Sequence, residues 1–92
     1  MERRVSVTLY VLKSRKSERR YVGITGNLAR RLREHAGGNS KGGQLLGGFI
    51  LLYTEEFPDY ETARMQEKFL KSGQGRKRLD EIEAALRPAR GG

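Results

Sequence analysis

The stretch YVGITGNLARRLREH, residues 21–35, decides the fold that we predict for this chain. Its first four residues are aromatic, β-branched or small and indicate a short strand, which ends in a turn at Thr25 and Gly26. Asn27 follows, and its side-chain oxygen can accept a hydrogen bond from a free amide in the first turn of a helix. A strand followed directly by a capped helix predicts a fold that mixes both types of element.

The predicted helix carries apolar and reactive side chains on neighbouring strips of its surface. Leu28 and Leu32 lie four residues apart and predict a stripe that packs on a core. Arg31 and His35, also four residues apart, lie along the margin of that stripe. Together with Tyr21 in the preceding strand, they bring a phenol, a guanidinium and an imidazole to one junction, which suits a phosphate-binding site.

The composition favours an intracellular, cytoplasmic protein with a polyanionic partner. The chain has 92 residues, no cysteine and one histidine, which excludes disulfides, thiolate zinc sites, a cysteine nucleophile and a histidine-rich metal site. The longest apolar run, residues 49–53, is too short to span a bilayer, and we identify no signal peptide. The net charge of +8 favours a polyanion, although charge that serves solubility alone is the alternative.

The segment VSVTLYVL near the amino terminus predicts a first strand with one apolar face and one mixed face, and Tyr10 is on the mixed face. A turn closed symmetrically over residues 14–17 would pair Tyr10 directly with Tyr21 across an antiparallel hairpin. The same register would place Lys13 opposite Glu18, a favourable pair of charges. A bulge would instead put the two tyrosines on opposite faces, so both arrangements stay open.

The glycine-rich segment AGGNSKGGQLLGG, residues 36–48, predicts a loop. Its glycines do not fit a nucleotide-binding phosphate loop, and a flexible connector is favoured over a flap that contacts substrate. Residues 49–57 (FILLYTEEF) open with a continuous apolar run. They predict a third strand that is covered on both faces at its start and more exposed at its end.

Two further helices are expected after the third strand. Asp59 caps the first of them, residues 60–71, and the second covers residues 76–87. Glu67 lies at the edge of the core-facing side, where a carboxylate needs a cation or hydrogen bonds to compensate it. A salt bridge to a neighbouring lysine or arginine would explain this position of Glu67 structurally, and a functional role is the alternative explanation. The residues predicted to form the core face of the first helix are Ala63, Met65, Gln66, Phe69 and Leu70.

These elements predict an α/β fold of the α+β type, in which a small, three-stranded, mostly antiparallel sheet is flanked by about three helices. We expect residues 1–92 to form a single domain with its core at about residues 5–86. Residues 87–92 are expected to be a flexible tail.

Several segments, in order along most of the chain, resemble the GIY-YIG nuclease superfamily. LYV resembles the first motif, with Tyr10 as its tyrosine, and YVG resembles the second, with Tyr21 eleven residues further on. The helix that follows resembles the third signature, in which Arg31 takes the place of the catalytic arginine and His35 matches a histidine of many members. The segment ETARMQEKFLKS is similar to the family's metal-binding segment, with Glu67 as the glutamate.

The sequence also departs from the family pattern. Thr8 stands where the first motif usually has a glycine, and Leu9 replaces the usual isoleucine or valine. The loop after His35 lacks the threonine-rich, basic pattern of many relatives. The resemblance therefore transfers no substrate preference.

The resemblance implies a metal-dependent endonuclease that hydrolyses DNA phosphodiester bonds. Glu67 would hold one Mg²⁺ or Mn²⁺ ion, since such hard cations need few carboxylates. Arg31 would grip the scissile phosphate and stabilise developing charge. Tyr10 is the candidate general base, Tyr21 would orient water or phosphate, and His35 is the second candidate base or a phosphate contact. The residues that we expect to contact substrate are Lys13, Gly23, Arg30 and Lys41.

A tyrosine can act as a base at neutral pH only if its pKa falls. At its ordinary pKa of about 10, the phenolate makes up about one part in a thousand. We expect the metal ion, Arg31 and Lys13 to lower the pKa of Tyr10 by favouring the phenolate. His35, whose ordinary pKa is about 6.5, is the alternative base.

The competing hypothesis is a non-catalytic nucleic-acid-binding module on the same scaffold, and a third reading is a protein-interaction domain. For the nuclease we expect DNA as the substrate, with branched and flapped forms among the candidates, and a role in repair or recombination. A protein partner or a homodimer would supply targeting, and no membrane is expected to take part.

Overall fold

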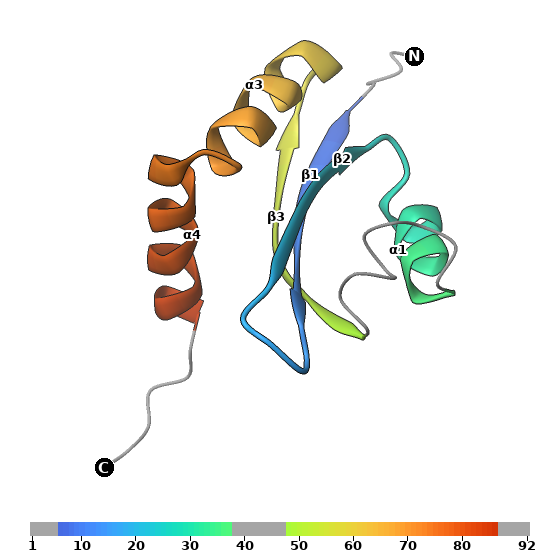
Figure 1. Ribbon diagram of the computed structural model, residues 1–92. Helices are drawn as coiled ribbons and strands as arrows, with labels where there is room; N and C mark the ends of the chain where they lie inside the picture. Colours follow the sequence, from blue (N-terminus) through green and yellow to red (C-terminus); the bar gives the residue numbers. More distant parts are fainter. Residues whose placement is uncertain (1–5, 38–47, 87–92) are drawn as a thin grey trace.

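The computed structural model describes residues 6–37 and 48–86 (Figure 1). Within these residues the chain forms three strands and three helices. The strands are β1 (Val7–Ser14), β2 (Arg20–Thr25) and β3 (Phe49–Phe57), and the helices are α1 (Leu28–Ala36), α3 (Tyr60–Leu70) and α4 (Gly73–Leu86). None of these described helices has the length and apolar character needed to cross a membrane. Most of the predicted glycine-rich loop, with Lys41, and the predicted tail at residues 87–92 lie outside the described residues.

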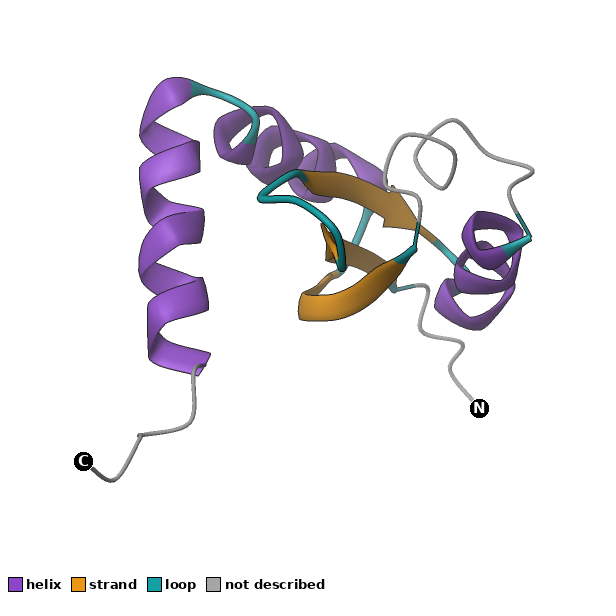
Figure 2. Cartoon of the chain, turned by 60° about the horizontal axis from the view of Figure 1, so that its bottom comes forward, coloured by secondary structure: helices purple, strands orange, loops and turns teal. Residues whose placement is uncertain are grey.

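The three strands form one antiparallel sheet in the order β2-β1-β3, so β1 is the central strand. Helix α1 covers one face of this sheet, and α3 and α4 lie on the other, as Figures 1 and 2 show from two directions. The predicted α+β fold, with its three-stranded antiparallel sheet and three helices, is thereby confirmed.

Side chains of β1 alternate between two cores, one on each face of the sheet. Leu9 and Val11 lie in a core completed by α3 and α4, whereas Tyr10 and Leu12 lie in a smaller core under α1. All four side chains are at most 1% exposed. The face that the alternation predicted to be mixed is therefore buried at Tyr10 and Leu12, because α1 packs over it there.

The hairpin register differs from the predicted one by two residues. Tyr10 lies opposite Gly23, and Tyr21 lies opposite Leu12, so the direct pairing of the two tyrosines was wrong. The turn closes one residue later than expected, since the Ser14 amide donates to the Arg19 carbonyl at 2.9 Å. Because side chains alternate with a period of two, a two-residue shift leaves both tyrosines on the same face.

Two strand details also correct the prediction. Lys13 lies opposite Arg20 in the sheet, although its ammonium still reaches Glu18 at 2.9 Å. The start of β3 is not covered on both faces, since Ile50 is 42% and Leu51 is 43% exposed. The two cores take Phe49, Leu52 and Tyr53 from this part of β3, and Ile50 and Leu51 belong to neither core.

The helix starts follow the predicted capping chemistry. The Asn27 side chain accepts from the Arg30 amide at 3.0 Å, and the Asp59 side chain accepts from the Thr62 amide at 2.8 Å. The core face of α3 is narrower than predicted, because Met65 is 68% and Phe69 is 40% exposed. The fully buried residues of α3 are Ala63 and Leu70.

Candidate functional site

The candidate site is built around the hydroxyl group of Tyr10, in the core between the sheet and α1. Tyr10 is 1% exposed. Its oxygen lies 2.9 Å from Nε2 of His35 and 3.4 Å from Nε of Arg31. Residues from β1 and α1 that are more than twenty positions apart in the chain are thus in direct contact.

Gly23 creates the space that the Tyr10 ring occupies. Gly23 lies opposite Tyr10 in the hairpin, and a Cβ atom added there would be 2.5 Å from the tyrosine oxygen. A side chain at this position would therefore displace the ring. The Tyr10 ring thus fills the space that the missing side chain of Gly23 leaves open.

Aromatic rings enclose the imidazole of His35. Its ring centre lies 5.1 Å from that of Tyr21, 5.6 Å from that of Tyr10 and 6.1 Å from that of Phe49. His35 is 2% exposed, so it lies inside the core and not, as predicted, at the margin of the apolar stripe of α1. The side chain lies inside because β2, β1 and the start of β3 each place a ring against this end of α1.

Burial disfavours the charged forms of both Tyr10 and His35 and shifts their pKa values accordingly. The pKa of Tyr10 is raised, chiefly by burial, while the hydrogen bond from Arg31 acts in the lowering direction and Tyr21 and Glu67 act in the raising direction. The expected lowering of this pKa was therefore wrong for the protein without a metal ion. The pKa of His35 is lowered, first by burial and then by the Arg31 charge.

The donor and acceptor atoms of each group limit the possible directions of these hydrogen bonds. Nε of Arg31 can only donate, so the Tyr10 oxygen accepts from it. The Tyr10 hydroxyl can donate its hydrogen to Nε2 of His35 when the neutral imidazole carries its own proton on Nδ1. In that tautomer the cluster is a directed chain from guanidinium to phenol to imidazole.

Arg31 is the member of this cluster that reaches solvent. Its side chain is 35% exposed, and Nη1 donates to Glu34 at 2.8 Å. Its pKa is raised, first by Glu34 and then by Tyr10. Glu34 was not among the predicted site residues, although the spacing of three positions on a helix is a signal for such an ion pair.

Glu67 approaches the site from the other face of the sheet. Its side chain is 19% exposed, and Oε2 accepts from Nζ of Lys71 at 3.1 Å. The salt bridge that offered a structural explanation for Glu67 is therefore present. The carboxylate contacts neither Tyr10 nor Arg31 directly, but its charge acts on Tyr10 and helps to raise its pKa.

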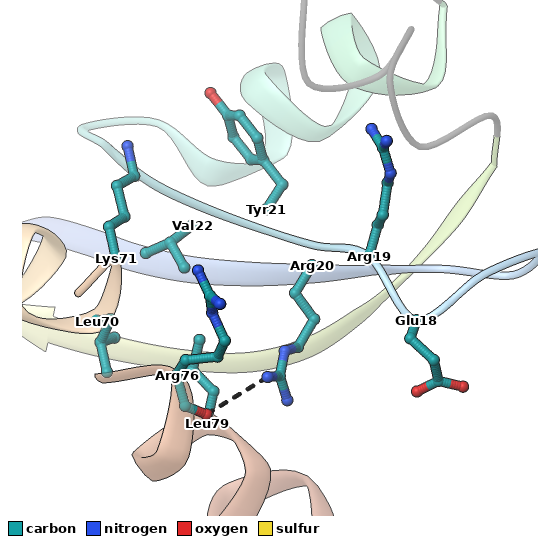
Figure 3. A pocket seen from close by; sticks show the side chains of 9 residues that line it. All are labelled: Glu18, Arg19, Arg20, Tyr21, Val22, Leu70, Lys71, Arg76 and Leu79. Carbon is teal, nitrogen blue, oxygen red and sulfur yellow. Dashed lines mark hydrogen bonds between the residues drawn. The ribbon is translucent and has the colours of Figure 1, made fainter. Parts of the chain in front are cut away.

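A groove lies at the outer edge of β2, between this strand and helices α3 and α4. It has a volume of about 520 Å³ and is lined by Tyr21 of β2, Lys71 after α3 and Arg76 of α4, among others. Figure 3 shows the side chains of Tyr21 and Lys71 extending to the same side of β2. Tyr21 thus belongs both to the Tyr10 cluster and to the wall of this groove.

The two other described residues that were predicted to contact substrate, Lys13 and Arg30, lie in different parts of the structure. Lys13 points to the α4 side, where it pairs with Glu83 and Glu18, and these acids raise its pKa. The structure does not bring Lys13 to the Tyr10 cluster. Arg30 is exposed on α1, 3.9 Å from the Glu34 carboxylate.

The chain is similar to known proteins over most of its length. A family model described as "GIY-YIG catalytic domain" matches residues 6–80. A structure of similar fold is the solution NMR structure of the UPF0213 protein BH0048 from Bacillus halodurans. It is 27% identical, with a TM-score of 0.54, and the match covers 88% of each chain. Among curated proteins no match was found.

Proposed function

The chain belongs to the GIY-YIG family of nuclease domains, and from this premise we propose that it is a divalent-metal-dependent endonuclease that hydrolyses DNA phosphodiester bonds. The observation that supports this most is the hydrogen bond of 2.9 Å between Tyr10 and His35 beside the guanidinium of Arg31. It provides a proton acceptor and a phosphate ligand at one place. The matched residues 6–80 leave little of the chain outside one nuclease domain.

Tyr10 and His35 act as one base in this proposal. The attacking water gives a proton to the Tyr10 oxygen while the Tyr10 hydroxyl gives its own proton to Nε2 of neutral His35. The water oxygen then forms the new bond to phosphorus, the leaving oxygen departs with the electron pair of its bond and takes a proton from solvent, and the imidazole holds the proton of the attacking water as imidazolium. This route needs no free phenolate, which agrees with the raised pKa of Tyr10.

Arg31 binds the scissile phosphate in the proposed reaction. Its planar fork suits two phosphate oxygens, and its partial exposure makes it the reachable member of the cluster. Because Tyr10 is almost fully buried, the attacking water has to enter beside Arg31. Tyr21, whose ring lies 6.2 Å from that of Tyr10, would orient the water or the phosphate.

Glu67 is the residue that would hold a metal ion. Among the described residues no group of three or more histidine, aspartate or glutamate side chains could enclose one. A single partly exposed carboxylate fits Mg²⁺ or Mn²⁺, which keep several waters and bind through few protein oxygens. The bound ion would supply neutralisation of charge on the phosphate oxygens.

The test is a cleavage panel over single-stranded, double-stranded, flapped and branched DNA with Mg²⁺ or Mn²⁺. Arg31→Ala and Glu67→Gln should each abolish cleavage, and binding in chelator should remain because neither change removes the other basic side chains. The near-complete burial of Tyr10 favours one other candidate function, a non-catalytic DNA-binding module. Salt-sensitive binding by the intact chain without cleavage of any of these DNA forms would establish that alternative.

A further inference from the structure

The groove at the outer edge of β2 has a strongly positive lining. Four of its side chains are cationic and one, Glu18, is anionic. The cationic side chains are Arg19, Arg20, Lys71 and Arg76. Its volume of about 520 Å³ falls within the range of about 300–1,000 Å³ that is typical of ligand sites.

The four cations differ in how far other groups neutralise them. Arg20 donates to Asp80 at 2.7 Å and to Glu83 at 3.1 Å, and Lys71 is paired with Glu67. Arg19 and Arg76 are exposed, and neither forms an ion pair with another described residue. By contrast, the exposed Arg78 on the same helix as Arg76 is paired with Glu81 at 3.3 Å. The groove thus collects two guanidinium groups whose charge is not balanced locally.

The groove adjoins the Tyr10 cluster through Tyr21. The side chains of Arg19, Tyr21 and Lys71 extend to one side of β2 in Figure 3, and the guanidinium of Arg76 points from α4 toward the strand. The apolar part of the wall includes Val22 and Leu70. Cationic groups above an apolar wall suit a chain of phosphates joined by sugars better than they suit an isolated anion.

We propose that this groove binds backbone phosphates of the DNA strand that flank the phosphate held by Arg31. The proposal rests on the assigned nuclease function, since it takes the ligand at Arg31 to be DNA. Arg19 and Arg76 are its principal ligands, because guanidinium forks match phosphate oxygens and theirs are free to do so. Lys71 becomes a further phosphate ligand when a metal cation replaces its ammonium group as the partner of Glu67.

Equilibrium binding without cleavage tests the groove. The probe is a fluorescein-labelled DNA duplex of about 20 base pairs in EDTA, and anisotropy is recorded between about 50 and 300 mM salt. Each lost phosphate contact should reduce the slope of log affinity against log salt by about 0.9, so Arg19→Ala/Arg76→Ala should lower it by nearly 2 and weaken binding at least about tenfold at low salt. If this double variant unfolds, Arg19→Gln/Arg76→Gln replaces it.

The matched control is Lys16→Ala/Arg78→Ala, which removes the same charge from the hairpin turn and from the outer side of α4. It should change the slope far less. Equal losses of DNA affinity in the two double variants would contradict the proposed role of the groove. So would a wild-type salt slope in Arg19→Ala/Arg76→Ala. So would a lack of salt-dependent binding by the intact chain. Groove-dependent binding by a chain that cleaves no DNA would remove the nuclease assignment and leave the groove in place.

Discussion

The Tyr10 hydroxyl lies 2.9 Å from Nε2 of His35, and both groups are almost completely removed from solvent. A phenol and an imidazole that share a hydrogen bond in a buried site exchange a proton without bulk water. Burial disfavours the charged form of both groups, so in the proposed reaction the pair would accept a proton as a unit rather than through a phenolate. Activity should therefore depend on the contact between them.

Tyr10→Phe removes the shared hydrogen and keeps the ring. Cleavage should fall by about 10²–10⁴-fold, the range for loss of a general base, and stability should fall by about 1 kcal/mol. The comparison is Tyr53→Phe, which removes a hydroxyl that donates to Glu55 at 3.2 Å. Rates of DNA nicking and urea unfolding measure both effects, and equal rates for the two variants would contradict the role of Tyr10.

Lowering the pH should destabilise the protein through His35. The pKa of folded His35 lies below that of the unfolded chain, about 6.5, so the unfolded chain takes up the proton first as the pH falls. The stability contributed by the neutral imidazole is complete above about pH 6.5 and is lost below it. Unfolding of wild type and His35→Gln between about pH 5 and 8 should show this slope in wild type alone.

Gly23→Ala should disturb the site without changing any reactive group. The new methyl group would lie 2.5 Å from the Tyr10 oxygen, which forces the ring to move and costs about 1–3 kcal/mol. Gly73→Ala is the control, because an added Cβ there meets no atom within 4 Å. Cleavage and thermal unfolding of the two variants should differ clearly, and a fully active Gly23→Ala would show that the packing of Tyr10 is not needed.

Lys71→Met should strengthen binding of Mn²⁺ to the free protein. The ammonium of Lys71 lies 3.1 Å from Oε2 of Glu67 and competes with a metal ion for the same carboxylate. A partly exposed ion pair contributes at most about 1 kcal/mol, so the gain should be no more than about fivefold. Lys68→Met, at an exposed neighbouring position, is the control for titration calorimetry. An unchanged affinity in Lys71→Met would place the metal away from Glu67.

Local chemistry made much of this fold predictable from the sequence. Asn27 and Asp59 cap helices in the structure as their side chains and positions suggested. The hairpin register was harder to predict from the sequence. It depends on which residue closes the turn, and the segment around residues 14–19 is polar throughout. The exposure of Ile50 was missed because an apolar run looks the same in a central strand and in an edge strand.

The candidate site was predictable to a different degree for each group. The side chains on consecutive elements, Tyr21, Arg31 and His35, could be placed together because a strand leads directly into a helix. The direction of the pKa shift of Tyr10 could not be predicted. Burial raises this pKa and the Arg31 guanidinium lowers it, and only the packing decides which of the two effects is larger. The pairing of Arg31 with Glu34 was visible in the spacing and was overlooked.

Helix α1, which carries Arg31, and helix α3, which carries Glu67, lie on opposite faces of the sheet. The sheet therefore separates the helix of a proposed anion ligand from the helix of a proposed cation ligand. A flat molecule resting on one face would meet only one of these helices. A ligand that engages both has to bend around an edge of the sheet.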